Sequence, residues 1–550
     1  VAGTHHDSLM QLLDWSVLRR RGDERFDMHG LMLRFSREKL ALDPQEEQQT
    51  RHAHANHYAN LVTRAGWELE TGNLEAAEAL NAESANAISA WAYGVEQADQ
   101  SIIERMMRWL LDFYRKRGEH ALAQAAYRQA LDAFEEDGEY SEESAFLGSL
   151  HLRLSKSYGL VTEPEAYHHA SEAVRLLRAT APLDHLELAQ ALVRLGLTTA
   201  AQKRERQGTA YLVEAIDHFR AVDSRRGLGA ALRDWGHLAW GRARLRLAQS
   251  KFEASIEILE GLDHQGHAQS LFILGYILTL RGHYARAESL SKQALPVVLA
   301  LEEQFLTMFI YRNLGDLYVA TGDFDEAERY FHQAFIRFEQ VGFEHEVIIP
   351  DSLSPGVLAR LRGDQDAEEK LAYAVKIAKQ VKIAKRTAIS QHHLAVLWHD
   401  EGRYGAAFAL LDEALEYAHQ SGSFYVIAQV QVQRARTMFA LSQLAKARGM
   451  LLEAIEISDR EGLDRVVCSA IKVAASLFQR NGDAATAIMH LAFVQHCEYS
   501  EWETKKQAHE ALSQLQQETD AATYKTAWKM GQNETLSTVV SGVVERLQRL

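Results

Sequence analysis

The chain has 550 residues, six prolines, two cysteines and a formal net charge of −15 at pH 7. The scarcity of proline favours helix, and the negative charge argues against a general affinity for nucleic acid or anionic membranes. Two cysteines cannot build a disulfide framework, and the longest apolar run, residues 271–280, is far shorter than the roughly 20 residues of a membrane span. We therefore expect an all-α protein of the cytoplasm, without a membrane partner or direct nucleic-acid binding.

Residues 1–45 differ from the rest of the chain and are predicted to combine helices with a hairpin. Leu9–Trp15 has a helical pattern, the following residues to position 30 favour two strands that turn at Gly22–Asp23, and Leu31–Leu40 returns to a helical period. A helix, a hairpin and a helix in this order form the C-terminal half of a winged helix. Acidic and basic side chains are nearly balanced over residues 1–60, so we expect a solvated hairpin rather than a DNA-binding wing.

The sequence RFDMHGL, residues 25–31, resembles the winged helix of STAND signal-transduction ATPases, the NB-ARC-type nucleotide switches. Met28-His29-Gly30 stands where that family carries Met-His-Asp, with Gly30 departing from the family's Asp. The resemblance implies that His29 contacts the β-phosphate of ADP bound by an upstream NTPase domain of the same chain. It also implies ADP or ATP with Mg²⁺ in the parent protein. Residues 1–550 contain no G-x-x-x-x-G-K-[ST] phosphate loop, so we expect no cofactor and no enzymatic activity in this fragment.

Residues 46–100 are predicted to be linker helices. Part of this range resembles a segment that follows the winged helix in STAND regulators, E-x-x-N-x-x-x-A-W, carried here by Glu83, Asn86, Ala90 and Trp91. The histidines at positions 52, 54 and 57 would point to different sides of a helix. We therefore do not expect them to form a zinc site.

Residues 101–500 repeat one pattern with a period of about forty residues. Six alanines are spaced by forty, at positions 287, 327, 367, 407, 447 and 487. A small residue such as Gly315 lies twelve positions before such an alanine, and a turn such as 321–323 lies between them. This spacing predicts two antiparallel helices per repeat, with the small residue allowing close approach. The pattern resembles the tetratricopeptide repeat and implies an α-solenoid, a right-handed superhelix of about ten helix pairs.

One repeat is irregular, because Pro350 and Pro355 fall where its first helix should run. Proline is tolerated at the start of a helix and disrupts its interior. We therefore expect either a shortened first helix with a local change in stacking, or a simple kink.

Residues 501–550 are predicted to be capping helices, because a solenoid needs a polar end. The pattern favours one amphipathic helix over 501–517, followed by one or two shorter helices. Residues 523–536 resemble a closing segment of bacterial signalling ATPases, Y-x-x-A-W-x-x-G. The resemblance implies a natural C-terminus, whereas the start at Val1 rather than methionine suggests a fragment of a longer protein.

In a tetratricopeptide solenoid the first helix of each pair lines the concave groove. Offsets of −3, +1 and +4 from the small residue are expected to be exposed there. They give the candidate partner-binding side chains Arg233, His237, Trp240, Phe272, Tyr276, Arg312, Asp316, His392 and His399, together with Thr279, Val319 and Val396. Exposed aromatic and arginine side chains in one groove are typical anchors for a peptide or protein. A generic polar lining is the alternative for any one of them.

The resemblance implies a sensor arm of a STAND-type regulator, which binds an inducer or partner protein in the groove and biases the adjoining nucleotide switch. A constitutive tetratricopeptide scaffold that assembles a complex without switching is the alternative. The sequence contains no paired acids, triad spacing or metal cluster that would favour an enzyme. It leaves open the ligand, the upstream effector domain and the output of the signal.

Overall fold

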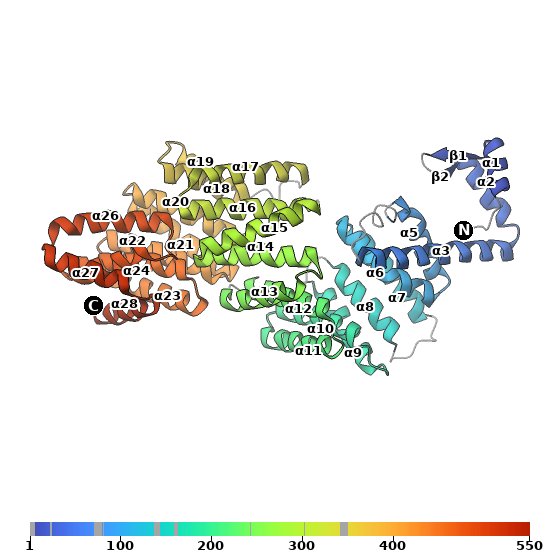
Figure 1. Cartoon of the computed structure of the whole chain (residues 1–550), viewed down its shortest axis with the longest axis horizontal. Coiled ribbons are helices and arrows are strands. Elements are labelled where there is room, and N and C mark those ends of the chain that lie inside the picture. Colours follow the sequence, from blue (N-terminus) through green and yellow to red (C-terminus); the bar gives the residue numbers. More distant parts are fainter. Residues whose placement is uncertain are drawn as a thin grey trace. The chain divides into compact units, whose positions relative to one another are not determined.

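The computed structural model describes residues 6–21, 25–70, 80, 82–136, 144–158, 163–241, 244–301, 303–341 and 350–550. These residues form 27 helices and one two-stranded hairpin, which confirms the nearly all-helical fold (Figure 1). None of the described helices is long and apolar enough to cross a membrane. The chain divides into two compact units, residues 1–224 (unit 1) and 225–550 (unit 2). This division falls inside the range 101–500 that the sequence predicts as one superhelix.

The start of unit 1 has the predicted order of helix, hairpin and helix: α1 (His6–Asp14), β1 (Leu18–Arg21), β2 (Arg25–Met28) and α2 (Gly30–Leu40). The two strands pair antiparallel, with Leu18 opposite Met28. The predicted turn at Gly22–Asp23 lies outside the described residues. Several large apolar side chains of this segment are exposed: Met10, Trp15, Phe26, Leu31, Leu33 and Phe35. A cluster of exposed apolar side chains is typical of a surface that packs against another element.

The remaining helices of unit 1 are α3 (Pro44–Glu70), α5 (Ser84–Glu96), α6 (Gln100–Lys116), α7 (His120–Glu136), α8 (Ala145–Ser157), α9 (Pro164–Ala179), α10 (His185–Ala201) and α11 (Glu205–Ala221). The E-x-x-N-x-x-x-A-W segment begins at the N-terminus of α5, where Asn86 donates a hydrogen bond to Glu83 at 2.7 Å. Trp91 of the same segment is buried and contacts the ring of Tyr127 edge-on at 5.4 Å. The segment therefore anchors α5 in the core of unit 1.

Unit 2 contains seven consecutive helix pairs. Their bounds are α12 (Arg225–Gly241) with α13 (Leu245–Leu259), α14 (His264–Arg281) with α15 (Tyr284–Ala300), α16 (Gln304–Thr321) with α17 (Phe324–Val341), α18 (Pro350–Arg362) with α19 (Ala367–Gln380), α20 (Ala384–Asp400) with α21 (Tyr404–Ser421), α22 (Phe424–Ala440) with α23 (Leu444–Glu461), and α24 (Asp464–Arg480) with α25 (Ala484–His496). The forty-residue pattern predicted each of these pairs.

Close contact between the two helices of a pair depends on small residues. All six alanines spaced by forty lie near the start of a second helix and are buried. A Cβ atom added at Gly315 would lie 2.4 Å from the ring of Phe331, so any larger residue there would push α16 away from α17. Gly322 ends α16 with φ +89°, a conformation that L side chains rarely adopt. The small residues therefore have the predicted structural role.

The first helix of the irregular repeat, α18, is described from Pro350 onward. Helix α18 has 13 residues, whereas α16 has 18. Pro355 lies inside α18, where it removes one backbone hydrogen bond. Residues 342–349, which precede this helix, lie outside the described residues.

Three helices follow the repeats, α26 (Trp502–Glu518), α27 (Ala521–Asn533) and α28 (Leu536–Arg549), in agreement with the sequence prediction. The residues at the start of α26 also contact earlier repeats of unit 2. Tyr499 contacts His283 between α14 and α15 at 4.8 Å, and Trp502 contacts Phe324 of α17 at 5.0 Å. Residues 498–503, called the clamp segment below, thus join the last repeat of unit 2 to repeats far earlier in the sequence.

Candidate functional site

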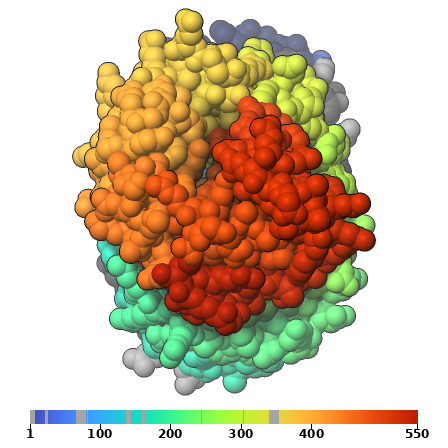
Figure 2. Space-filling view, turned by 90° about the vertical axis from the view of Figure 1, so that its left-hand side faces the viewer, coloured from blue at the N-terminus to red at the C-terminus, as the bar shows by residue number. Residues whose placement is uncertain are grey.

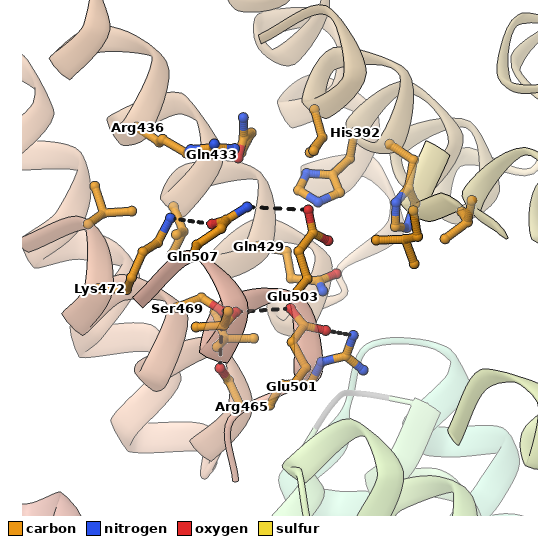
Figure 3. A pocket seen from close by; sticks show the side chains of 18 of the residues that line it. His392, Gln429, Gln433, Arg436, Arg465, Ser469, Lys472, Glu501, Glu503 and Gln507 are labelled. Carbon is orange, nitrogen blue, oxygen red and sulfur yellow. Dashed lines mark hydrogen bonds and ion pairs between the residues drawn. The ribbon is translucent and has the colours of Figure 1, made fainter. Parts of the chain in front are cut away.

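The inner surface of unit 2 contains a cavity of about 110 Å³ beside the start of α26 (Figure 3). The helices α16, α18, α20, α22 and α24, each the first of its pair, contribute side chains to the cavity, as does α26. On α24, Arg465, Ser469 and Lys472 all line it, because residues three, four and seven positions apart share one face of a helix. Figure 2 shows a narrow hollow between the orange and red helices of this unit.

Cations outnumber carboxylates in the lining of the cavity. The cations are Arg360, Arg436, Arg465 and Lys472, and the carboxylates are Glu501 and Glu503. Both carboxylates are already paired, Glu501 with Arg465 and Glu503 with Arg360. Arg436 pairs at 2.9 Å with Asp400, a carboxylate outside the lining, so Lys472 of α24 is the cation that remains without a carboxylate partner.

Lys472 is the cation of the lining without a carboxylate partner. Its Nζ donates to Oε1 of Gln507 at 2.6 Å, and Nε2 of Gln507 donates to Glu503 at 3.3 Å (Figure 3). No carboxylate among the described residues lies within 4.0 Å of Nζ. Burial lowers the pKa of Lys472 to about 7, because few charges compensate for the lost hydration of the ammonium group.

The pKa values of His392, His393 and Glu503, which also line the cavity, are shifted as well. Burial lowers the pKa of His392 to about 4 and that of His393 well below its usual value, so both rings are neutral at pH 7. Burial acts to raise the pKa of Glu503, but the two hydrogen bonds from Arg360 outweigh it and lower this pKa to about 2. Shifted pKa values cluster at functional sites, and here they surround one cavity.

Several polar atoms of the lining have no hydrogen-bond partner among the residues that the structure describes. They are Nδ1 of His392, Nδ1 of His393, Nε2 of Gln433, Nε of Arg360 and Nε of Arg465. Buried polar atoms of proteins are nearly always paired. They belong to the same lining as Lys472 and are available to a polar group that enters the cavity.

The groove residues that the sequence predicted differ in whether they line this cavity. His392, Val319 and Val396 line the cavity. Arg312 and Asp316 form an ion pair at 3.8 Å on α16, and burial raises the pKa of Asp316. The remaining candidates on α12 and α14 do not line this cavity: Arg233, His237, Trp240, Phe272 and Tyr276.

Exposure was predicted wrongly at four positions: Phe272, Thr279, Val396 and His399 are buried. The ring of Phe272 lies 6.5 Å from that of Phe309, and Nδ1 of His399 lies 3.1 Å from the hydroxyl of Thr437. Both contacts are with the first helix of the next repeat. Side chains at the −3 and +4 offsets can therefore pack between neighbouring first helices instead of facing the groove.

Sequence reasoning missed the strongest charges of the site, although one signal was available. The same offsets from Ala435 and Ala475, the small residues of two later repeats, give Arg436 and Lys472. The groove candidates come from earlier repeats only. No offset rule gives Glu503, because it belongs to α26 and reaches the cavity through tertiary contacts.

His29 lies outside this cavity, in unit 1. It is the exposed N-cap residue of α2, and its Nδ1 accepts a hydrogen bond from the backbone N–H of Leu31 at 3.3 Å. A neutral ring in this arrangement carries its proton on Nε2. The described residues contain no group of three or more His, Cys, Asp or Glu side chains suited to a metal ion.

Residues 310–341 and 387–420 match the tetratricopeptide repeat family model. These tetratricopeptide repeats are the pairs α16–α17, from Ile310 onward, and α20–α21, and the first helix of each lines the cavity. No curated protein matches the sequence.

Solved structures with similar folds include a Rap protein in complex with the competence and sporulation factor. It is 17% identical with a TM-score of 0.47, and the match covers 65% of this chain and 99% of that chain. Aspartyl phosphate phosphatase F from Bacillus subtilis is 14% identical with a TM-score of 0.42, over 65% and 94% of the two chains. A STAND protein with a tetratricopeptide repeat sensor from Pyrococcus horikoshii is 14% identical with a TM-score of 0.39, over 80% and 74%. At these values the similarities assign no function to this chain.

Proposed function

We propose that the chain is the sensor arm of a STAND-type signalling ATPase, located in the cytoplasm. Its tetratricopeptide repeats, a right-handed superhelix of about ten pairs, would bind an inducer or partner protein that carries an acidic side chain. The observation that carries the proposal is the cation-rich cavity on the inner face of unit 2.

The size of the cavity favours one side chain of a larger partner over a free small molecule. Its volume of about 110 Å³ is well below the roughly 300–1,000 Å³ of typical small-molecule pockets. Its charge favours a carboxylate. Lys472 would donate a charge-assisted hydrogen bond, and Arg436 would donate a second one beside its ion pair with Asp400. Gln433 Nε2 would gain the partner that it lacks among the described residues.

A peptide pair that differs only in charge tests this proposal. Fluorescein-labelled tetraglutamate should bind the full chain at least tenfold more tightly than labelled tetraglutamine, as measured by fluorescence polarisation at constant ionic strength. Lys472→Gln and Arg436→Gln should each weaken tetraglutamate binding by about tenfold or more, because a charge-assisted hydrogen bond contributes roughly 1.5–3 kcal/mol.

Lys446→Gln is the matched control, since Lys446 is an exposed cation on α23 of the same unit. It should leave the affinity unchanged, and circular dichroism should confirm that all three variants are folded. Equal affinity for both peptides would show that the charge of the peptide is not recognised. An equal loss with Lys446→Gln would show only a general electrostatic attraction. Either result would contradict the proposed site.

We further infer that the first helices and the hairpin of unit 1 are the closing half of a winged helix beside an NTPase domain. The exposed apolar side chains of α1, β2 and α2 support this, because a completed winged helix would cover them. His29 also suits the role: its exposed ring would present Nε2–H as a donor to a phosphate oxygen. The nucleotide and Mg²⁺ would belong to that neighbouring domain, and this chain would hydrolyse nothing by itself.

His29→Asn should raise basal signalling of the parent protein by about tenfold without inducer, because losing a charge-assisted hydrogen bond to phosphate destabilises the closed state. Asparagine keeps an acceptor at the N-cap of α2, so the helix itself is preserved. The readout is the reporter output or oligomeric state of the parent with and without inducer. Unchanged basal output would reject the latch and favour a constitutive scaffold.

A further inference from the structure

The two cysteines of the chain, Cys468 and Cys497, meet in space. Their sulfur atoms lie 3.5 Å apart, although the residues are 29 positions apart in the sequence. Cys468 is buried on α24, and Cys497 is the half-buried C-cap residue of α25. The antiparallel pairing of α24 and α25 brings them together.

The two thiols have different chemical environments. The hydrogen bond from the Cys468 thiol lowers the pKa of Cys497, and the backbone N–H groups of Tyr499 and Ser500 lower it further. The same sulfur–sulfur contact, together with burial, raises the pKa of Cys468. Because the thiolate is the reactive form of cysteine, Cys497 is the nucleophile of the pair and Cys468 is the thiol beside it.

The pair lies at the base of the clamp segment. Cys497 directly precedes residues 498–503, of which Glu501 pairs with Arg465 and Glu503 pairs with Arg360. Cys468 lies on α24, the helix that also presents Arg465 and Lys472 to the cavity. A covalent bond between the two cysteines would therefore tie the start of the clamp segment to the helix that carries the main cations of the site.

We propose that Cys468 and Cys497 are a redox modification site, at which a peroxide forms a reversible disulfide that holds the clamp segment against the repeats. The Cys497 thiolate attacks one peroxide oxygen, the O–O bond breaks, and the released hydroxide takes up a proton to become water. The resulting sulfenic acid is attacked by the sulfur of Cys468, which loses its proton as the second water leaves. Two thiols and one hydrogen peroxide thus give one disulfide and two waters. A small dithiol reduces this disulfide to the two thiols and is itself oxidised to a disulfide.

The test treats the reduced full chain with one equivalent of hydrogen peroxide, followed by alkylation and trypsin digestion. Mass spectrometry should detect the peptides 466–472 and 481–505 joined by a disulfide, and dithiothreitol should separate them again. The thiol titre of the denatured protein should fall from two to about zero. Amide hydrogen exchange over residues 498–507 should slow in the oxidised protein and recover on reduction.

Two variants assign the roles of the thiols. Cys468→Ala should leave Cys497 as a sulfenic acid that dimedone traps, whereas Cys497→Ala should leave Cys468 largely unmodified at the same peroxide dose. Retention of both thiols, disulfides between molecules, or faster reaction of Cys468 would each overturn the proposal. An intramolecular disulfide without slower exchange over 498–507 would overturn the effect on the clamp segment. Binding of tetraglutamate is measured separately on the reduced protein. The result of the disulfide experiment therefore does not depend on whether the groove binds that peptide.

Discussion

Arg360→Ala is expected to lower the free energy of unfolding by about 3–5 kcal/mol, the range found when one partner of a buried ion pair is removed. The Arg360 side chain is 6% exposed and donates two hydrogen bonds to Glu503, at 2.7 and 2.8 Å. Its Nη1 also lies 3.6 Å from a carboxylate oxygen of Asp400. Removing the guanidinium leaves two carboxylates without this partner at the edge of the cavity. Urea denaturation of the full chain measures the loss.

Arg362→Ala is the matched control on the same helix. Arg362 pairs with Asp325 and Glu328, whose side chains are exposed, and pairs of this kind contribute about 0–1 kcal/mol. The double variant Arg360→Met with Glu503→Met should recover much of the stability, because it leaves neither partner charge buried alone. Similar losses for Arg360→Ala and Arg362→Ala would contradict the view that the clamp segment is held mainly by the buried pair.

Lys472→Met is expected to raise the free energy of unfolding at pH 7 by about 2–4 kcal/mol, since one unit of pKa shift corresponds to about 1.4 kcal/mol. Lys472 has a pKa of about 7 in the folded protein against 10.5 when unperturbed. Below pH 7 the ammonium is charged in both states, and folding carries the full cost of burying it. Between pH 7 and 10.5 only the unfolded state still holds the proton, so the stability of the unmodified protein rises with pH.

The advantage of Lys472→Met should therefore be largest at or below pH 7 and disappear by about pH 10.5, as measured by urea denaturation across this range. The charged groups that act on Lys472 include Arg436, which lowers its pKa, and the carboxylates Asp400, Glu501 and Glu503, which raise it. These groups stay charged across this range. Lys156 also has a pKa of about 7, so the difference in stability between Lys472→Met and the unmodified protein, rather than the slope of either one, reports Lys472. Lys446→Met, at an exposed position, should show no such gain. An advantage independent of pH would mean that Lys472 is solvated in the folded protein.

Two variants of Lys472 would together separate its effect on stability from its effect on binding. Lys472→Met should stabilise the fold, while Lys472→Gln should weaken binding of tetraglutamate. A buried cation that costs stability and serves binding is the trade-off expected of a functional side chain. Arg360, by contrast, belongs to the structure that shapes the cavity, because its charge is already neutralised by Glu503.

Much of the local structure could be predicted from the sequence. The alanines at intervals of forty residues, with Gly315 and its equivalents twelve positions earlier, predicted the helix pairs of unit 2. The pattern of residues 9–40 predicted a helix, a hairpin and a helix in this order. Each of these predictions depends on residues within about forty positions of one another.

The candidate site could be predicted only in part. The offset rule correctly selected His392 as a cavity residue, and its extension to later repeats selects Arg436 and Lys472. It failed at Phe272 and His399, because the offset alone does not tell whether a side chain faces the groove or the next first helix. That choice depends on how far each pair rotates relative to its neighbour.

The sequence by itself determined the helix pairs, since helical periodicity and the close approach of small residues act within one repeat. Only the tertiary structure decided which charges meet across unit 2. Arg281 of α14 reaches Asp464 of α24 at 2.9 Å, and Arg360 reaches Glu503, over separations of 183 and 143 residues. These contacts depend on the small rotation between successive pairs summed over several repeats, and no pattern within a single repeat encodes that sum. The cavity and the cations that line it result from this summed rotation.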